Sequence, residues 1–464
     1  MTPSRLRGGA GLRRILPVLI AGRLLILAPG APGAPAGGEP TLVQPPFGHC
    51  LGITRVGTFH LFLYLGTATS FSEPAGLTAV KLRSQDDPAT EHDDDELTVF
   101  GLNSGRSEII YNTSLTSVAI YGEPGRGDGQ FDRPRGIAAD EWGTVVVADT
   151  GNDRIVRLRY DGDELVFISS IAEVPASPPL LDGPSDVALG VSGRIYVTDS
   201  GNDRLLAFAP DGSLVMQLTG DPEVGVELEA PVGLAVVEDD DPHLDRRAGR
   251  IVVIDRAGTR LLSFGLDGRL RNSTTAGEGT SGSARFDYLA IDYHGSVYAT
   301  DTRGGRIHKF TRHLDHVTTI ESPGADGGDL DEPRGLTIWR RFGQVFVAER
   351  TGAQYFWMGT DVQDLEIDGG RFVPGVEPLR VRYHLTEISR VTVSLVDPQG
   401  RTIHTLADER RRAIGPNVER WDGLLPDGSR LPAGEYALTV RARPVYSSQA
   451  YFHDTESIRI IATH

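Results

Sequence analysis

Aspartate and arginine recur as a pair in the middle of the chain, always at the same spacing. Residues 145–155 read VVVADTGNDRI and residues 195–205 read IYVTDSGNDRL, so each aspartate precedes an arginine by five residues. Two weaker copies follow, and the four pairs are Asp149 with Arg154, Asp199 with Arg204, Asp255 with Arg260, and Asp301 with Arg306. A ring of carboxylates could bind a metal ion, whereas a carboxylate bonded to an arginine holds a turn together. Because every aspartate comes with its own arginine, we expect all eight residues to be structural.

Other residue types that carry chemistry do not recur in register. The histidines of the repeated region occupy different positions in the repeat: His60, His92, His243, His294, His308, His313 and His316. The single cysteine, Cys50, excludes an internal disulfide and a cysteine-based zinc site. The acidic runs Asp93–Glu96 and Glu238–Asp241 have a carboxylate density that suits calcium, but they lack the spaced ligands and glycine turn of a calcium loop, which indicates solvated loops. The sequence therefore favours a protein without a metal, a cofactor or catalytic residues.

A second signature precedes each Asp–Arg copy. It consists of a phenylalanine or leucine, then Pro-x-Gly, then a short β-prone run such as Gly136–Ala138. Pro-x-Gly predicts a sharp turn into a first strand, and three further β-prone runs follow it in a complete copy. Six copies are recognisable, in the third of which Asp186 replaces the glycine. Four strands per copy are typical of a propeller blade.

These copies resemble a known family. Phe131–Leu158 and Leu181–Phe208 are similar to NHL repeats, and the resemblance implies a six-bladed β-propeller over residues 55–365. The last copy lacks a fourth strand. We expect Thr58–Leu65 (TFHLFLYL) to supply it and to close the ring, because closure removes exposed sheet edges.

The repeat stops before residue 375, and the remainder, residues 375–464, shows short alternating strands such as Val391–Val396 separated by turn residues. Trp421-Asp422-Gly423, Asp427-Gly428 and Leu431-Pro432-Ala433-Gly434-Glu435-Tyr436 resemble the Ig-like domain of the FlgD type. The resemblance implies a small β-sandwich and a bacterial, exported protein. The predicted fold class is therefore all-β: a six-bladed NHL propeller followed by an Ig-like sandwich.

The N-terminus predicts export. Arg5, Arg7, Arg13 and Arg14 precede an apolar stretch from Ile15 to Ala28, so residues 1–36 are interpreted as an export signal and residues 37–54 as a linker. No later stretch is apolar over the length of a membrane helix, which predicts no membrane span in the mature chain and a periplasmic or secreted location. The net charge of −17 argues against a nucleic-acid partner, because phosphate contacts need clustered cations.

A propeller gathers equivalent turns around one mouth of its channel. The residues at the Pro-x-Gly turns are Ala75, Arg135, Ser185, Val232, Asp287 and Arg334, and Arg133 lies beside them. We predict that Arg133, Arg135, Arg334 and Asp287 bind a ligand with an acidic group, carried by a protein, a peptide or a glycan. The alternative is a metal-dependent hydrolase or lyase, lactonase-like or amidating-lyase-like, because six-bladed propellers of those kinds share the architecture. The sequence leaves the ligand and the oligomeric state open.

Overall fold

The computed structural model describes residues 41–45, 55–66, 69–86, 96–113, 117–245, 248–277, 284–321, 323, 329–368, 371–376 and 378–463. The predicted export signal, Cys50 and His92 lie outside these residues. Within them the chain is almost entirely β-structure, with one α-helix, α1 (Thr58–Leu65).

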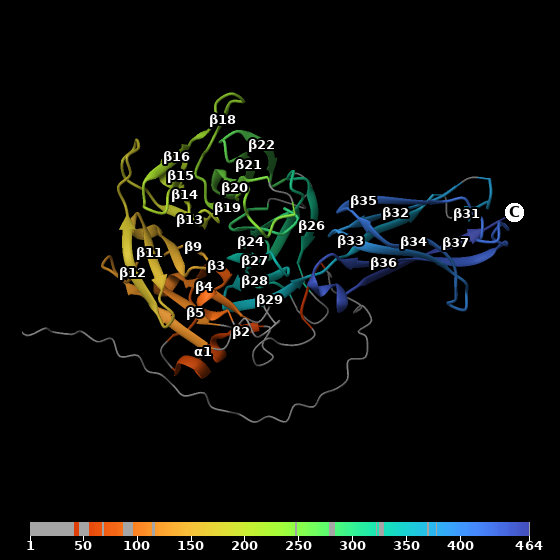
Figure 1. Ribbon diagram of the computed structural model, residues 1–464, viewed down its shortest axis with the longest axis horizontal. Coiled ribbons are helices and arrows are strands. Elements are labelled where there is room, and N and C mark those ends of the chain that lie inside the picture. Colours follow the sequence, from red (N-terminus) through yellow and green to blue (C-terminus); the bar gives the residue numbers. More distant parts are fainter. Residues whose placement is uncertain are drawn as a thin grey trace, which may run out of the picture. The chain divides into compact units, whose positions relative to one another are not determined.

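Six sheets make up the first part of the described chain (Figure 1). In chain order, and from the innermost strand outward, the first five are β3 (Pro74–Lys81), β4 (Leu97–Asn103), β5 (Glu108–Thr113) and β6 (Ser117–Tyr121); β9 (Gly136–Ala139), β10 (Thr144–Asp149), β11 (Arg154–Tyr160) and β12 (Leu165–Ile171); β13 (Pro184–Leu189), β14 (Ile195–Asp199), β15 (Arg204–Phe208) and β16 (Leu214–Leu218); β19 (Gly233–Val237), β20 (Arg250–Asp255), β21 (Arg260–Gly265) and β22 (Leu270–Thr275); and β23 (Leu289–Ile291), β24 (Val297–Asp301), β25 (Arg306–Phe310) and β26 (His316–Ile320). The sixth contains β27 (Leu336–Trp339), β28 (Gln344–Glu349) and β29 (Gly352–Met358). Short two-stranded pairs, β7 (Glu123–Pro124) with β8 (Gln130–Phe131) and β17 (Gly220–Asp221) with β18 (Val226–Glu227), lie between sheets in the sequence.

The six sheets form a closed ring, which is a β-propeller. The innermost strands contact one another in the cycle β3, β9, β13, β19, β23, β27 and back to β3. Each of six apolar core clusters contains residues of two neighbouring sheets. Alternation along the strands explains this: Val145 and Val147 of β10 enter the cluster shared with the preceding sheet, while Val146 and Ala148 enter the cluster shared with the following one. Middle strands are therefore apolar on both faces.

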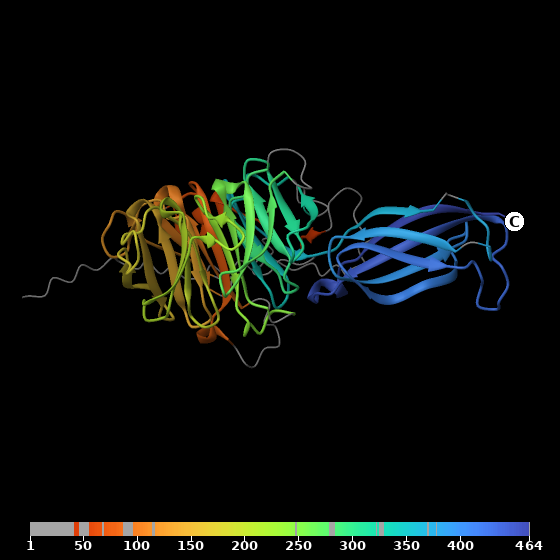
Figure 2. The same cartoon turned by 90° about the horizontal axis from the view of Figure 1, so that it is seen from above.

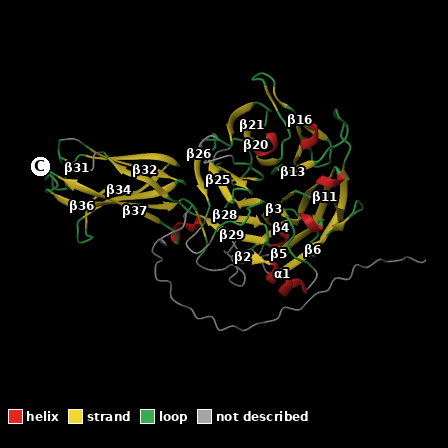
Figure 3. Cartoon of the chain, turned by 180° about the vertical axis from the view of Figure 1, so that it is seen from behind, coloured by secondary structure: helices red, strands yellow, loops and turns green. Residues whose placement is uncertain are grey.

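The ring closes differently from the sequence prediction. Both β1 (Leu42–Val43) and β2 (Arg55–Gly57) pair antiparallel with the outer edge of β29. The N-terminal chain thus supplies the missing outer pairing, but the prediction that Thr58–Leu65 is that strand is wrong, because this segment is α1, which contacts β2 and β6 (Figure 3). The edge of β29 is already occupied, and the backbone N–H of Gly57 donates to His60 Nδ1 over 3.1 Å at the start of the helix. β1 also lies inside the segment interpreted as a linker.

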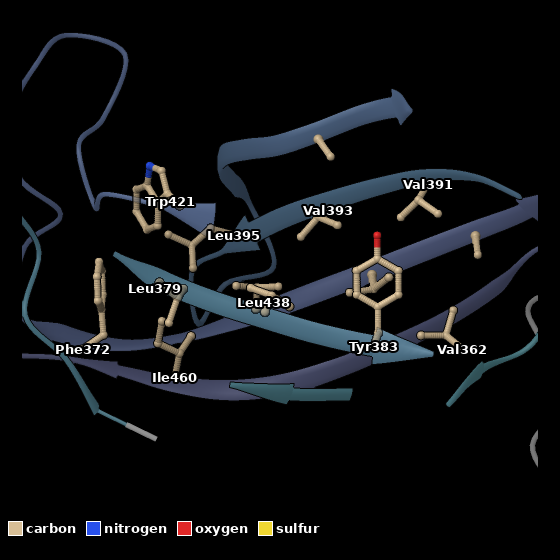
Figure 4. Packing of buried hydrophobic residues seen from close by; sticks show 14 of the residues in the cluster. Val362, Phe372, Leu379, Tyr383, Val391, Val393, Leu395, Trp421, Leu438 and Ile460 are labelled. Atoms are coloured by element: carbon tan, nitrogen blue, oxygen red, sulfur yellow. The ribbon is translucent and has the colours of Figure 1, made fainter. Parts of the chain in front are cut away.

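The C-terminal part is a sandwich of two sheets (Figure 2). One contains β30 (Val362–Ile367), β32 (Leu379–Leu385) and β35 (Gly415–Trp421); the other contains β31 (Arg371–Phe372), β37 (Asp454–Ala462), β36 (Gly434–Pro444), β33 (Ser389–Val396) and β34 (Thr402–Arg412). Tyr383, Leu395 and Leu438 are among the side chains packed between the two sheets (Figure 4). Because β30 pairs with β32, the sandwich begins earlier in the sequence than residue 375.

The propeller and the sandwich belong to one compact unit. Lys309 of β25 and Glu387, in the turn between β32 and β33, form an ion pair at 2.6 Å in which both side chains are fully buried. Tyr446, which follows β36, is packed in the same apolar cluster as Tyr298 and Phe356 of the propeller. Charge and apolar burial together hold the junction.

Candidate functional site

The Asp–Arg pairs lie in the turns between the second and third strands of their sheets. Asp149 Oδ2 accepts hydrogen bonds from Arg154 Nε (2.8 Å) and Asn152 Nδ2 (2.9 Å), and its Oδ1 accepts one from the backbone N–H of Asp132 (2.8 Å). Arg154 also donates to the carbonyl groups of residues 126, 127 and 130. Burial is the main cause that raises the pKa of Asp149, and these donors oppose it. Every strong polar group of the turn therefore has a partner inside the protein.

The other three pairs repeat this geometry with small variations. Arg204 Nε lies 2.6 Å from Asp199 Oδ2 with both side chains buried, and Arg260 donates to Asp255 over 2.8 Å through Nε. Arg306 Nε lies farther, at 3.4 Å, from Asp301 Oδ2. In the sixth sheet Glu349 takes the acidic position and is bonded by Gln354 and by Arg55 of β2. The structure thus places each aspartate beside its own arginine, and the purely structural role of the pairs stays a prediction for mutagenesis.

Neighbouring residues of the same turns connect successive sheets. The hydroxyl of Thr150 donates to the carbonyl of Pro184 over 2.8 Å, and Thr302 makes the equivalent bond to Pro333 over 2.9 Å. Asp153 Oδ1 accepts from the backbone N–H of Gly183 in the next sheet over 2.9 Å. Each turn therefore fixes the position of the next Pro-x-Gly segment.

The glycine of Pro-x-Gly serves close approach rather than the turn itself. A Cβ on Gly76 would lie 2.6 Å from the carbonyl oxygen of Arg135, and one on Gly335 would lie 2.2 Å from that of Ala75. Neither glycine has a positive φ; instead the residue before the proline does, as at Glu73, Arg133 and Glu332, with φ of 48°, 45° and 51°. Left-handed backbone costs free energy in these non-glycine residues, and it recurs around one rim of the ring.

That rim surrounds a pocket of about 450 Å³. Its lining comes from four of the six sheets and the turns before them: Glu73, Pro74, Ala75, Ser104, Arg133, Arg135, Thr150, Gly151, Asp287, Tyr288, Thr302 and Arg334. All four residues predicted from the sequence to bind a ligand are therefore brought together. Ser185 and Val232, the equivalent turn residues of the third and fourth sheets, do not line it. The volume is in the range of small-molecule sites.

The three arginines of the pocket differ in their surroundings. Arg133 is the most accessible, with 73% of its side chain exposed and Asp132 at 3.3 Å. Arg334, 25% exposed, donates to Glu332 over 3.0 Å and to the carbonyl of Pro74 over 3.4 Å. Arg135 is partly buried, and Tyr288, ahead of Asp287 and Asp186, raises its pKa above the ordinary value. All three stay protonated across the physiological range.

A buried carboxyl group lies close to Arg135. Asp186 accepts hydrogen bonds from the backbone N–H groups of Leu234 and Val187, both at 2.9 Å, and so joins the third sheet to the fourth. Burial raises its pKa to about 7, against the effect of these donors and of Arg135. The aspartate that interrupts the Pro-x-Gly pattern is thus a bridge between sheets.

Sequence reasoning missed several pocket residues and misread one loop. Tyr288, Glu73 and the hydroxyls of Thr150 and Thr302 were not predicted, although the threonines follow the repeated aspartate directly and could have been found by that position. The prediction of a solvated loop at Glu238–Asp241 is wrong. Glu238 is buried and accepts from the hydroxyls of Ser192 (2.8 Å) and Tyr196 (2.9 Å), and Asp241 is buried in an ion pair with Arg340. Both partners are remote in the sequence.

Across the described ranges, no three His, Cys, Asp or Glu side chains gather in a way that could hold a metal ion. His308 and His316 approach each other, with ring centroids 6.0 Å apart, and both rings contact the hydroxyl of Thr319 at 3.1 Å. His243 lies elsewhere, against Trp339, and His294 lies between Tyr293 and Tyr446. The histidines therefore do not converge on the pocket.

The fold defines an NHL-type propeller joined to an Ig-like sandwich, and comparison with known families agrees. The NHL repeat matches residues 181–208, and the FlgD Ig-like domain matches residues 354–444. No curated protein is similar enough in sequence to count as a match. None of the described helices is long and apolar enough to cross a membrane.

Several solved propeller structures are similar in fold at low identity. A streptogramin B lyase is 15% identical, with a TM-score of 0.41, over 62% of this chain and 94% of its own. A putative gluconolactonase is 16% identical, with a TM-score of 0.42, over 66% of this chain and 97% of its own. PorZ of Porphyromonas gingivalis, a bacterial surface component of the type-IX secretion system, is 13% identical, with a TM-score of 0.47, over 89% of this chain and 54% of its own.

Proposed function

We propose that this protein is an exported, non-catalytic recognition protein that binds an acidic group of its ligand in the pocket at the propeller mouth. The observation that carries the proposal is the convergence of Arg133, Arg135 and Arg334, from different sheets, on one cavity of about 450 Å³. These cations stand out in a chain whose net charge is −17. A guanidinium group can bond a carboxylate through two parallel hydrogen bonds, which gives direction as well as attraction.

The other lining groups suit a ligand that is polar around its acidic group. Thr150 and Thr302 present hydroxyls, Tyr288 presents a ring, and Asp287 and Glu73 can accept hydrogen bonds from ligand hydroxyl or ammonium groups. The rigid ring fixes these side chains, while the turns that carry them can vary without disturbing the strands. An acidic peptide or an acidic glycan satisfies both features.

A metal-dependent hydrolase or lyase is the second candidate, favoured by architecture alone. It makes a different experimental prediction, since such an enzyme retains a metal after dialysis and turns over a lactone or amide substrate. Metal analysis of the purified chain, with a hydrolysis assay on a panel of lactones, distinguishes it from a recognition protein.

The test of the mouth is a binding screen with acidic peptides and uronic-acid oligosaccharides, each beside its neutral counterpart. We expect a compact acidic ligand to bind the wild type and to bind the Arg135→Gln, Arg334→Gln double variant about 10-fold or more weakly, because charge-assisted hydrogen bonds are lost. The matched control is Arg256→Gln with Arg350→Gln, two half-exposed arginines in the turns of other sheets that do not line the pocket. Binding that survives in the double variant, with its melting temperature unchanged, removes the mouth as the site.

A further inference from the structure

We propose that the outer face of the larger sandwich sheet binds a linear, carboxylated polysaccharide through a row of arginines. The row crosses three adjacent strands. Arg390 of β33 has Arg411 of β34 as its Cα partner on one side and Arg443 of β36 on the other. Arg441 lies two residues from Arg443 and therefore on the same face of the sheet.

The strand pattern shows that this face is turned to solvent. Val391, Val393 and Leu395 alternate with Arg390 along β33 and are fully buried in the sandwich core, so Arg390 projects from the opposite face. Arg390, Arg411 and Arg441 are exposed, and Arg443 is partly exposed. Neighbouring strands lie about 4.8 Å apart, which sets the separation of the cations along the row.

Like charges directly opposite one another destabilise a sheet. Few carboxylates offset them here. Arg443 pairs with Glu409, whose pKa it holds below the ordinary value, and Arg411 lies 3.6 Å from Asp245. Within the described residues Arg390 and Arg441 have no ion pair, and the contact of Arg390 is with the backbone carbonyl of Glu409 at 3.5 Å. A row of this kind has unused capacity for anions.

The rest of the face favours a polysaccharide over a protein or a nucleic acid. The next rows of the sheet consist of small hydroxyl residues on the same three strands: Thr392, Ser394, Thr439, Thr455 and Ser457. Hydroxyls bond sugar hydroxyl groups as donors and acceptors. None of the exposed large apolar side chains of the described chain lies on β33, β36 or β37, whereas protein interfaces have an aromatic or apolar centre and single-stranded nucleic acid stacks on aromatic rings.

The charge distribution along the chain supports this choice. Residues 362–464 contain 13 arginines and no lysine against 14 Asp and Glu, so the sandwich accounts for almost none of the net charge of −17. A polyanion is therefore repelled by the remainder of the chain and meets its most favourable potential on the sandwich. The fork of a guanidinium group fits a carboxylate better than a point charge does.

The test measures binding of the full chain to labelled polygalacturonate, a linear polymer with one carboxylate per sugar. Dextran is the neutral probe, and a single-stranded oligonucleotide is the second polyanion. We expect the Arg390→Gln, Arg441→Gln variant to bind polygalacturonate about 10-fold or more weakly and to show a smaller salt dependence, because each lost cation releases fewer counterions. Its melting temperature should be equal to that of the wild type or higher, since like-charge repulsion is relieved.

The matched control removes the same charge from the other sheet. Arg380→Gln with Arg420→Gln, on β32 and β35, should change the affinity less than about 2-fold because these residues lie on the opposite face. The mouth variant Arg135→Gln, Arg334→Gln should bind polygalacturonate like the wild type, which separates this surface from the pocket. The proposal is overturned by absence of polygalacturonate binding at low salt, by equal losses in the ladder and control variants, or by an oligonucleotide that binds as tightly as polygalacturonate.

Discussion

Arginine has opposite surroundings in the two regions of this molecule. In the propeller turns, Arg154 and Arg204 are buried, and each donates to one aspartate and to nearby backbone carbonyls. On the outer sandwich face, Arg390 and Arg411 are exposed and stand opposite each other. The residue type alone therefore says little about its role; the partner and the burial decide whether it stabilises the fold or awaits a ligand.

This comparison predicts the largest effect at Arg204. Replacement by methionine leaves Asp199 as a buried charge without its partner, and we expect the free energy of unfolding to fall by about 3–5 kcal/mol. Arg390→Met on the sandwich should leave the unfolding midpoint unchanged. Urea unfolding of the full chain, followed by tryptophan fluorescence, measures both. Equal losses in the two variants would contradict the contrast between buried pairs and the exposed row.

The closure of the ring gives the next effect. Leu42 of β1 is fully buried against Phe356 and Met358, so Leu42→Ala should lower the free energy of unfolding by about 2–4 kcal/mol through the cavity it leaves. Leu63 of α1, 59% exposed, is the control, and Leu63→Ala should have little effect. If the propeller unfolds at the same urea concentration in the Leu42 variant as in the wild type, β1 does not close the ring.

The buried carboxyl group beneath the mouth predicts a pH dependence of opposite sign to that of the sandwich. Because burial raises the pKa of Asp186 to about 7, the native state keeps a proton that the unfolded chain loses near pH 4. Stability therefore falls as pH rises through this window, by about 2–3 kcal/mol between pH 5 and pH 7. Glu409, whose pKa Arg443 lowers, contributes stability above its unfolded pKa that is lost only as the pH falls.

Unfolding midpoints of the wild type and of Asp186→Asn at pH 5, 6, 7 and 8 measure this dependence. The variant should lose most of the slope and keep only a smaller part from Asp292, whose pKa burial raises to about 6. An unchanged slope in the variant would show that Asp186 is ionised in the native propeller.

The smallest effect concerns the hydroxyl ties between sheets. Thr302→Val keeps the shape of the side chain but removes its bond to the carbonyl of Pro333, and we expect a loss of about 1 kcal/mol. Thr302→Ser retains the hydroxyl and should lose less. A thermal melt of the three proteins compares them, and identical melting temperatures for Val and Ser would mean that the tie contributes nothing.

The repeat made much of the propeller predictable. Alternating apolar residues specify strands, and Asp and Arg five residues apart can meet across a single turn, so these features depend only on neighbours in the sequence. The convergence of Arg135 and Arg334 was also predictable, because equivalent positions of a closed repeat face the same mouth. Their binding role stays a prediction.

Features that depend on distant partners were not predictable from the sequence. Thr58–Leu65 has the composition of a strand, yet it is a helix because β1 and β2 occupy the edge of β29. Glu238 and Asp241 look like a solvated run, but Ser192, Tyr196 and Arg340 satisfy them in the interior.

The arginine row on the sandwich shows the same division. The sequence determined that β33, β34 and β36 are strands and that Arg390 lies opposite the buried valines. Only the tertiary structure decided that Arg411 and Arg443 are its neighbours, since strand register is fixed by pairing between segments and by the bulges within them. Local patterns are set by short-range sterics and burial, whereas the partner of a charge is set by which strands meet.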